Sequence, residues 1–208
     1  MISVKICGVT TTEDALAARE AGADLIGLNF SSQSVRRIDL ETAQIIASES
    51  LKGFAGLTGL FVEQSWEEVA EINRSLKLMY AQFYTHPWPK VRFTPAGLIP
   101  AFRVRNEDDI QNIHRSLAEG PKPSMIVVDS FVAGAMGGTG HKAPWELLAG
   151  QDFGVPLILA GGLTPENVAE AIRTVRPWGV DVASGVESSP GRKCPEKMKA
   201  FVGAVRGV

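Results

Sequence analysis

Cysteine and histidine are scarce in this chain of 208 residues, which holds two cysteines and three histidines. The cysteines, Cys7 and Cys194, are too few for a disulfide framework and suggest a reducing compartment. The histidines, His86, His114 and His141, do not have the spacing of metal ligands. The sequence therefore predicts neither a disulfide-stabilised secreted domain nor a metal site.

A strong net charge and a long hydrophobic run are also missing. The chain has 21 lysines and arginines against 23 aspartates and glutamates, so its formal net charge of −2 gives no electrostatic footprint for nucleic acid or an anionic membrane. No apolar stretch approaches the ~18 residues that span a bilayer, and no basic flank followed by an apolar run marks a signal peptide. We therefore expect a cytoplasmic protein without nucleic-acid or membrane partners. The sequence does not distinguish a monomer from a homodimer.

Short apolar strands alternate with amphipathic helices along the chain, without a linker or a break in composition. The predicted strands are 4–7, 25–29, 57–62, 78–82, 99–104, 125–129, 156–159 and 180–183. The predicted helix starts are Thr10, Asp39, Ser65, Asn106, Thr164 and Pro195, chosen as capping residues or as a first-turn proline. This pattern indicates a single α/β domain that spans residues 1–208.

One stretch interrupts the alternation. Residues 85–100 contain Pro87, Pro89, Pro95 and Pro100, and internal prolines break a helix. We therefore expect an irregular, proline-rich segment where the fourth helix of a regular alternating fold would lie.

Two architectures fit eight strands that alternate with helices: a doubly wound open sheet and a closed (β/α)8 TIM barrel. Side chains alternate between the two faces of a strand, so Val4 and Ile6 share one face while Lys5 and Cys7 share the other. An open sheet covered by helices would be apolar on both faces. The barrel is favoured because polar residues recur at inward positions of several strands, namely Lys5, Gln82, Arg103, Asp129 and Asp181.

Two glycine-containing loops follow the last two predicted strands. Gly161 and Gly162 lead from one strand toward a helix, and Ser184 and Gly185 follow the next strand. Backbone amides in the loops after the seventh and eighth strands of such barrels often bind phosphate. Each pair taken alone could be no more than a tight turn, but two such loops at matching places favour a site for a phosphate monoester.

A thiol and a carboxyl group are predicted at the same rim. Cys7 ends the first strand on its inward face, and Asp129 ends the sixth strand on its inward face. A buried cysteine alone is more often a small hydrophobic residue, and an aspartate in this position could cap the following loop. Together the two groups can move protons in opposite directions on one substrate. Arg36 or Arg37, in the loop after the second strand, is a candidate for binding a second anion such as a carboxylate.

These motifs, taken in order, resemble the phosphoribosylanthranilate isomerase family of tryptophan biosynthesis. The matching residues are Lys5-Ile6-Cys7-Gly8, Gly137-Gly138-Thr139-Gly140, Leu159-Ala160-Gly161-Gly162-Leu163 with Pro165-Glu166-Asn167, Val180-Asp181-Val182 with Ser184-Gly185-Val186-Glu187, and Pro190-Gly191, Lys193 and Phe201. The resemblance implies a (β/α)8 barrel and an Amadori rearrangement of a phosphosugar, N-(5-phosphoribosyl)anthranilate, without a cofactor.

The resemblance also implies roles for single residues. Cys7 is the expected general base and Asp129 the expected general acid. Arg36 is expected to bind the anthranilate carboxylate, while the amides of Gly161, Gly162, Ser184 and Gly185 hold the phosphate. We further expect strand closure to pair Lys5 with Asp181, which would limit how far Lys5 stabilises a Cys7 thiolate.

The chain departs from the family at three places. It has Gln82-Phe83-Tyr84-Thr85 where the family has Gln-Leu-His-Gly, Ala143-Pro144-Trp145 where the family has Phe-Asp-Trp, and Val35 where proline is common. Two alternatives to the isomerase therefore stay open: a non-catalytic phosphosugar-binding relative, and an isomerase for another aminated ribose phosphate. Retention of both Cys7 and Asp129 favours catalysis.

Overall fold

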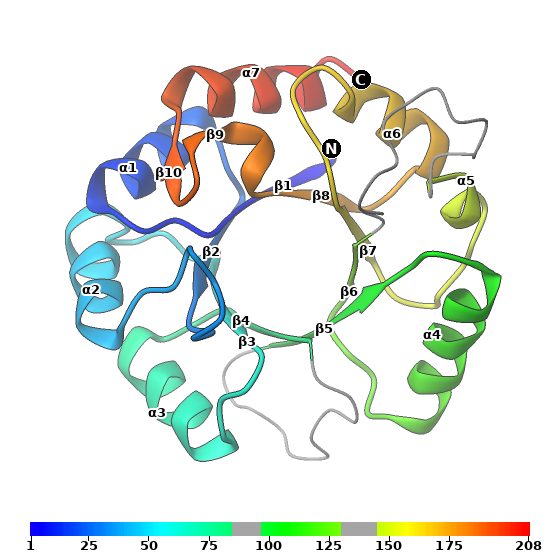
Figure 1. The fold of residues 1–208 in the computed structure, drawn as a ribbon, viewed down its shortest axis with the longest axis horizontal. Coiled ribbons are helices and arrows are strands. Elements are labelled where there is room, and N and C mark those ends of the chain that lie inside the picture. The colour runs from blue at the N-terminus through cyan, green and yellow to red at the C-terminus, as the bar shows by residue number, and fades with distance from the viewer. Residues whose placement is uncertain (85–96, 130–144) are drawn as a thin grey trace.

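Eight parallel strands form a closed barrel with helices around it (Figure 1). The computed structural model describes residues 1–84, 97–129 and 145–208. The strands follow one another around the ring in chain order: β1 Ser3–Cys7, β2 Leu25–Asn29, β3 Leu57–Phe61, β4 Tyr80–Phe83, β5 Gly97–Arg103, β6 Ile126–Asp129, β7 Leu157–Ala160 and β8 Gly179–Val182. The ring closes where β8 pairs with β1. The barrel prediction is therefore confirmed, and the open-sheet alternative is wrong.

The helices lie outside the ring and pack against the strands (Figure 1). They are α1 Thr12–Ala21, α2 Leu40–Ile45 with the π-helical turn η1 Ile46–Ser50, α3 Trp66–Leu76, α4 Glu107–Glu119, α5 Trp145–Leu148, α6 Val168–Val175 and α7 Pro195–Arg206. After β8 come a 3₁₀ turn, η2 Ser184–Val186, and a small hairpin of β9 Glu187–Ser189 and β10 Arg192–Lys193. Within the described ranges, no helix is both long and apolar enough to cross a membrane.

The proline-rich segment predicted in place of the fourth helix lies largely outside the described residues. Its last part, however, belongs to a strand: β5 begins at Gly97, and Pro100 pairs with Phe83 of β4. The glycine-rich stretch 134–140, Ala143-Pro144, His86 and His141 also lie outside the described part of the chain.

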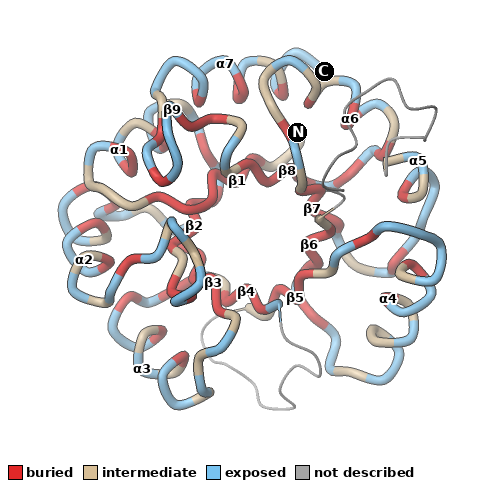
Figure 2. Tube along the Cα trace, viewed as in Figure 1, coloured by how far each residue is buried: buried red, intermediate tan, exposed pale blue. Residues whose placement is uncertain are grey.

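The barrel strands are largely buried (Figure 2), and the alternation of their side chains separates two apolar clusters. Outward-facing Val4 and Ile6 are fully buried against the helices, in the larger apolar cluster. The inside of the barrel holds a second apolar cluster, Leu25, Ile99, Ala101, Met125, Val127, Ile158 and Ala160, together with buried Lys5, Gln82 and Asp181. Lysine and aspartate in the barrel interior are expensive to bury unpaired, so their arrangement matters for the site.

The helix starts follow the capping residues with two corrections. Asp39, Ser65 and Asn106 cap helices as predicted, and Ser65 forms the full capping box with Glu68. The cap of α1 is Thr11 and not Thr10, because the Thr11 side chain accepts a hydrogen bond from the Asp14 amide. The Thr10 hydroxyl instead donates to the Gly191 carbonyl at 2.7 Å.

The second correction concerns α6, which begins at Val168 and not next to Thr164. Thr164 and Pro165 lie in a turn that Asn167 stabilises: its side-chain oxygen accepts from the Thr164 amide at 2.8 Å, and its amide donates to the Gly162 carbonyl at 2.9 Å. The residues after the glycine pair are therefore held as a loop before the helix starts.

Candidate active site

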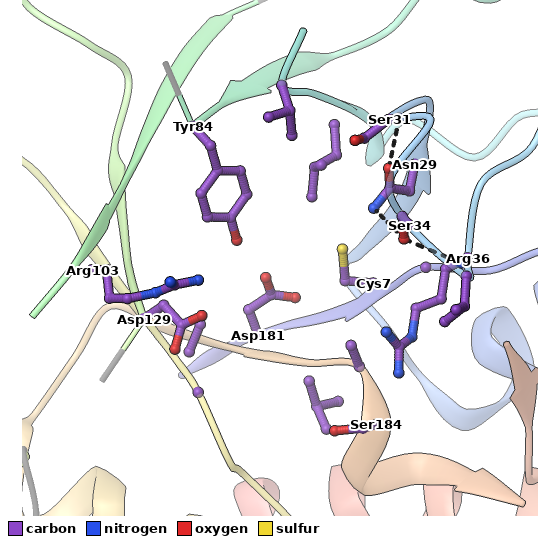
Figure 3. A pocket seen from close by; sticks show the side chains of 18 of the residues that line it. Cys7, Asn29, Ser31, Ser34, Arg36, Tyr84, Arg103, Asp129, Asp181 and Ser184 are labelled. Atoms are coloured by element: carbon purple, nitrogen blue, oxygen red, sulfur yellow. Dashed lines mark hydrogen bonds between the residues drawn. The ribbon is translucent and has the colours of Figure 1, made fainter. Parts of the chain in front are cut away.

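A cavity of about 680 Å³ opens at the carboxyl ends of the barrel strands. Side chains or backbone at the end of every strand line it: Cys7, Asn29, Leu60, Tyr84, Arg103, Asp129, Ala160 and Asp181. Figure 3 shows several of these side chains pointing toward the centre of the cavity. This end of a (β/α)8 barrel is the one at which catalytic residues gather.

Cys7 and Asp129 both face this cavity. Cys7 ends β1 and Asp129 ends β6, and Figure 3 shows them on different sides of the pocket with Asp181 between them. Gly27 of the neighbouring β2 leaves room for the thiol, because a Cβ at that position would lie 2.8 Å from the Cys7 sulfur. The structure therefore brings the two predicted proton-transfer groups to one pocket.

Lys5 pairs with Asp181 below Cys7. The two residues are register partners on β1 and β8, and the Lys5 Nζ lies 2.9 Å from the Asp181 Oδ2, with the lysine side chain fully buried. Burial alone would lower the pKa of Lys5, but Asp181 and then Cys7 raise it above its ordinary value. The predicted pairing is confirmed.

The environment of Cys7 favours the neutral thiol. Burial raises its pKa above the ordinary value of 9.0; Lys5 opposes this shift, while the Asp181 carboxylate adds to it. Because the lysine charge is largely balanced by Asp181, it does not offset the burial of the sulfur. In the free protein the thiol is therefore mostly protonated at neutral pH.

Arg36 lines the cavity beside Cys7 and is held by Glu187. The Arg36 Nε and Nη2 donate to the Glu187 Oε1 and Oε2, both at 2.7 Å. Gly8, with φ +73°, allows this position, because a Cβ there would lie 2.4 Å from the Arg36 Cδ. Arg36 and not Arg37 is among the lining residues, so the structure favours Arg36 of the two arginines considered.

The two glycine loops meet at the rim next to β7 and β8. Gly161, Gly162 and Ser184 line the cavity, and both glycines have positive φ, at 94° and 63°. Gly185 instead packs against the other loop: a Cβ on it would lie 1.9 Å from the Leu163 carbonyl oxygen. The loops thus interlock, with Gly185 as the point of contact and the other three residues facing the cavity.

Tyr84 and Glu187 are site residues to which the sequence pattern alone assigned no role. Tyr84 follows β4 in the same inward register as Gln82, and Figure 3 shows its hydroxyl directed into the cavity. Burial raises the pKa of Tyr84, so the phenol stays neutral and can donate a hydrogen bond. The inward position of Tyr84 could have been inferred from the period of two, but the partner of Glu187 could not, because Arg36 lies in a loop that has no periodic pattern.

Comparisons with known proteins identify the family. A family model described as N-(5'phosphoribosyl)anthranilate (PRA) isomerase matches residues 4–204. The chain belongs to the N-(5'-phosphoribosyl)anthranilate isomerase family. A family member from Pseudomonas fluorescens is 44% identical over 203 residues, which are 97% of each chain, and one from Neisseria gonorrhoeae is 42% identical over 97% of this chain and 95% of the relative.

Solved structures of phosphoribosylanthranilate isomerases agree over the whole chain. The enzyme from Thermotoga maritima is 35% identical, with a TM-score of 0.86 and complete coverage of both chains. A second crystal structure, in complex with reduced 1-(o-carboxyphenylamino)-1-deoxyribulose 5-phosphate, is 34% identical with a TM-score of 0.85, again over both full chains. The resemblance inferred from the sequence motifs is thus confirmed at the level of the family and the fold.

Proposed function

We propose that this barrel catalyses the Amadori rearrangement of N-(5-phosphoribosyl)anthranilate to 1-(2-carboxyphenylamino)-1-deoxyribulose 5-phosphate, an isomerisation of tryptophan biosynthesis. The observation that carries the proposal is a thiol and a carboxyl group that face one cavity with an arginine and an amide-rich double loop at its rim. Membership of the isomerase family, and a related structure that holds a reduced form of the product, support the same substrate class.

Substrate binding divides into two anion sites. The loops after β7 and β8 offer backbone amides near Gly161, Gly162 and Ser184 to the phosphate, with Gly185 keeping the loops together. Arg36 offers a guanidinium, whose planar geometry suits a carboxylate, to the anthranilate end. The ribose would then lie between these two sites, over Cys7 and Asp129.

Asp129 acts as the general acid and Cys7 as the general base. Asp129 donates a proton to the ribose ring oxygen as the bond from this oxygen to C1′ breaks, which opens the ring to a Schiff base. Cys7, as the thiolate, then removes the proton from C2′, and the electron pair of that bond moves toward the positively charged nitrogen to give an enolamine. Protonation at C1′ with loss of the 2-hydroxyl proton gives the ketone. Electrons shift only within the substrate, so the reaction consumes no external oxidant or reductant.

The raised pKa of Cys7 is compatible with this role. A thiolate formed at low population is a strong base, and the Schiff-base cation makes the C2′ proton more acidic at the moment of transfer.

The described strands close into one barrel, and we propose that residues 1–208 form a single domain. We also propose that the protein acts in the cytoplasm.

Activity and two isosteric variants test the proposal. Purified protein should consume N-(5-phosphoribosyl)anthranilate, followed by loss of its fluorescence, and Cys7→Ser and Asp129→Asn should each lower kcat/KM by at least ~10²-fold. Cys194→Ser, at the start of α7 and outside the cavity lining, is the matched thiol control and should retain the wild-type rate. Phosphosugar binding without turnover by the wild-type protein would instead support a binding protein derived from the family.

The oligomeric state is a separate question. A related isomerase from Thermotoga maritima is described as a dimer from which monomers were generated. We propose that this chain is a monomer or a homodimer, and light scattering after size-exclusion chromatography distinguishes the two. A larger assembly would contradict the proposal.

A further inference from the structure

Glu187 is buried next to Arg36, outside the cavity lining, and contacts two cationic side chains. It is the first residue of β9, directly after the turn that carries Ser184, and its side chain is only 5% exposed. Its two carboxylate oxygens accept hydrogen bonds from Arg36, and the Oε1 also accepts one from the Lys193 Nζ at 2.9 Å. A carboxylate buried between two cations is available for neither proton transfer nor substrate binding.

We propose that Glu187 is a positioning residue that sets the orientation of Arg36 for a carboxylate on the substrate. An arginine side chain has five N–H donors arranged on two edges. Glu187 occupies the edge formed by the Nε and Nη2. The edge formed by the two terminal nitrogens is left over, and it is the one that can make a bidentate contact with a ligand carboxylate at the cavity that Arg36 lines.

Glu187 is itself held in place on several sides. Lys193, on the partner strand β10, donates from its side chain to the Ala183 carbonyl at 3.0 Å and from its backbone to the Asp14 Oδ2 at 3.1 Å. The hairpin turn is attached to the loop after β1, where the Thr10 hydroxyl donates to the Gly191 carbonyl. These contacts fix the hairpin and with it the Glu187 carboxylate. Because the carboxylate is fixed, it holds the Arg36 side chain in one orientation.

The charges of this cluster suit a ligand anion. Burial tends to raise the pKa of Glu187, but hydrogen bonds from Arg36 and Lys193 bring the pKa below its ordinary value, so Glu187 is ionised at neutral pH. Because Glu187 accepts hydrogen bonds from both Arg36 and Lys193, the two cations are held apart by one carboxylate. Without Glu187, two like charges would face each other, and Arg36 would be free to adopt other rotamers.

The cluster also links the two anion sites of the substrate. Glu187 lies three residues after Ser184 at the phosphate loop and holds the arginine that follows β2, so the start of the hairpin connects the two sites. The inferred consequence is selectivity for phosphosugars that carry a carboxylate at a fixed distance from the phosphate. This positioning role rests on the proposed carboxylate contact of Arg36.

Two ligands and four variants test the role. The ligands are reduced 1-(o-carboxyphenylamino)-1-deoxyribulose 5-phosphate and the same compound made from aniline, which lacks the carboxylate. The variants are Glu187→Gln, Glu187→Asp, Arg36→Met and, as a matched control, Glu20→Gln at an exposed position of α1. Dissociation constants come from calorimetry, kcat and KM from the fluorescence assay, and Tm from a thermal scan.

Glu187→Gln should raise the dissociation constant of the carboxylated ligand roughly 10-fold or more, because a charged hydrogen-bond partner of Arg36 is lost. The dissociation constant of the ligand without the carboxylate should rise less than about 3-fold. Its KM should rise more than its kcat falls. Glu187→Asp keeps the charge but is one methylene shorter, so it should also lose affinity for the carboxylated ligand alone. If Glu187→Gln does not fold, Glu187→Asp carries the same test. Glu20→Gln should match the wild type.

Each failure has a separate meaning. Equal weakening of both ligands by Glu187→Gln, or full selectivity retained by Glu187→Asp, would overturn the positioning role. If Arg36→Met weakens the binding of both ligands equally, the proposed carboxylate contact is wrong. If Arg36→Met weakens the binding of the carboxylated ligand alone, while Glu187→Gln weakens both ligands equally or neither, only the role of Glu187 is wrong.

Discussion

The two sides of the barrel mouth differ in how their polar side chains are satisfied. On the side formed by β8, β1 and β2, the charged groups are paired, Lys5 with Asp181 and Arg36 with Glu187, and of the described atoms there Asp181 Oδ1 lacks a hydrogen-bond partner. On the side formed by β3 and β4, among the residues that the structure describes, the buried Thr58 hydroxyl and both polar atoms of the Gln82 side chain have no hydrogen-bond partner. The paired side also carries most of the motifs that match the isomerase family, with a departure at Val35, whereas the other side carries the departure at Phe83-Tyr84.

The difference indicates where structure and function are most closely tied. A buried ion pair fixes two side chains together, and removal of one member leaves the other as an uncompensated charge. A buried amide without a partner contributes little to stability and can be replaced by an apolar group of similar shape. We therefore expect substitutions on the paired side to be costly and those on the β3–β4 side to be tolerated.

The largest effect is expected for Lys5→Met. This change leaves the Asp181 carboxylate buried without its cation and should lower the free energy of unfolding by ~3–5 kcal/mol. Urea unfolding at pH 7 measures the loss, with Lys52→Met at an exposed position as the control. A second change, Asp181→Leu, should restore part of the stability in the double variant. An unchanged midpoint for Lys5→Met would contradict the difference between the two sides.

The next prediction concerns the pH at which the Cys7 thiol loses its proton. Because burial raises the pKa of the thiol above its ordinary value, the thiolate fraction should still be rising at pH 9 without reaching a plateau. Absorbance at 240 nm, or the rate of alkylation, reports this titration in a Cys194→Ser background, where Cys7 is the remaining thiol. A titration midpoint below pH 8 would show that Lys5 outweighs burial and Asp181.

A smaller effect is expected for Gly185→Ala. Its Cβ would lie 1.9 Å from the Leu163 carbonyl oxygen, so the two loops must separate. The KM for the phosphosugar should rise by roughly tenfold while kcat changes less, since the weakened contact is with the phosphate. Gly203→Ala is the control, because an added Cβ in α7 meets nothing within 4 Å and helical alanine is favourable.

The smallest effect is expected for Gln82→Met. This substitution removes an amide that is fully buried and has no hydrogen-bond partner, at nearly constant volume, so the free energy of unfolding should change by less than ~1 kcal/mol in either direction. The same urea experiment measures it. A loss as large as that of Lys5→Met would mean that the β3–β4 side is as tightly coupled as the paired side.

The sequence predicted the features that depend on local periodicity and chain order. Side-chain alternation placed Cys7 and Asp129 inside the barrel, and the closure of a (β/α)8 ring placed Lys5 beside Asp181, 176 residues away. Strand ends shifted by one or two residues because pairing with neighbours, and not the apolar run alone, decides where a strand stops.

The failures have equally specific causes. Thr164 and Pro165 have the composition of a helix start, but Asn167 stabilises a turn there instead. Thr10 and Thr11 are both possible caps, and the choice between them depends on the Gly191 carbonyl, which the local sequence does not reveal. The Arg36–Glu187 pair joins two loops that have no periodic pattern, so it becomes visible only in three dimensions.

The pairing of β1 with β8 has a consequence for how the protein matures. During synthesis Cys7 leaves the ribosome early, whereas Asp181 and the loop around Ser184 are made near the end. Until the ring closes, the thiol lacks its surroundings and resembles any exposed cysteine, open to oxidation. The surroundings of Cys7 can therefore form only after the end of the chain has been made, and until then a reducing environment, and not burial, protects the thiol.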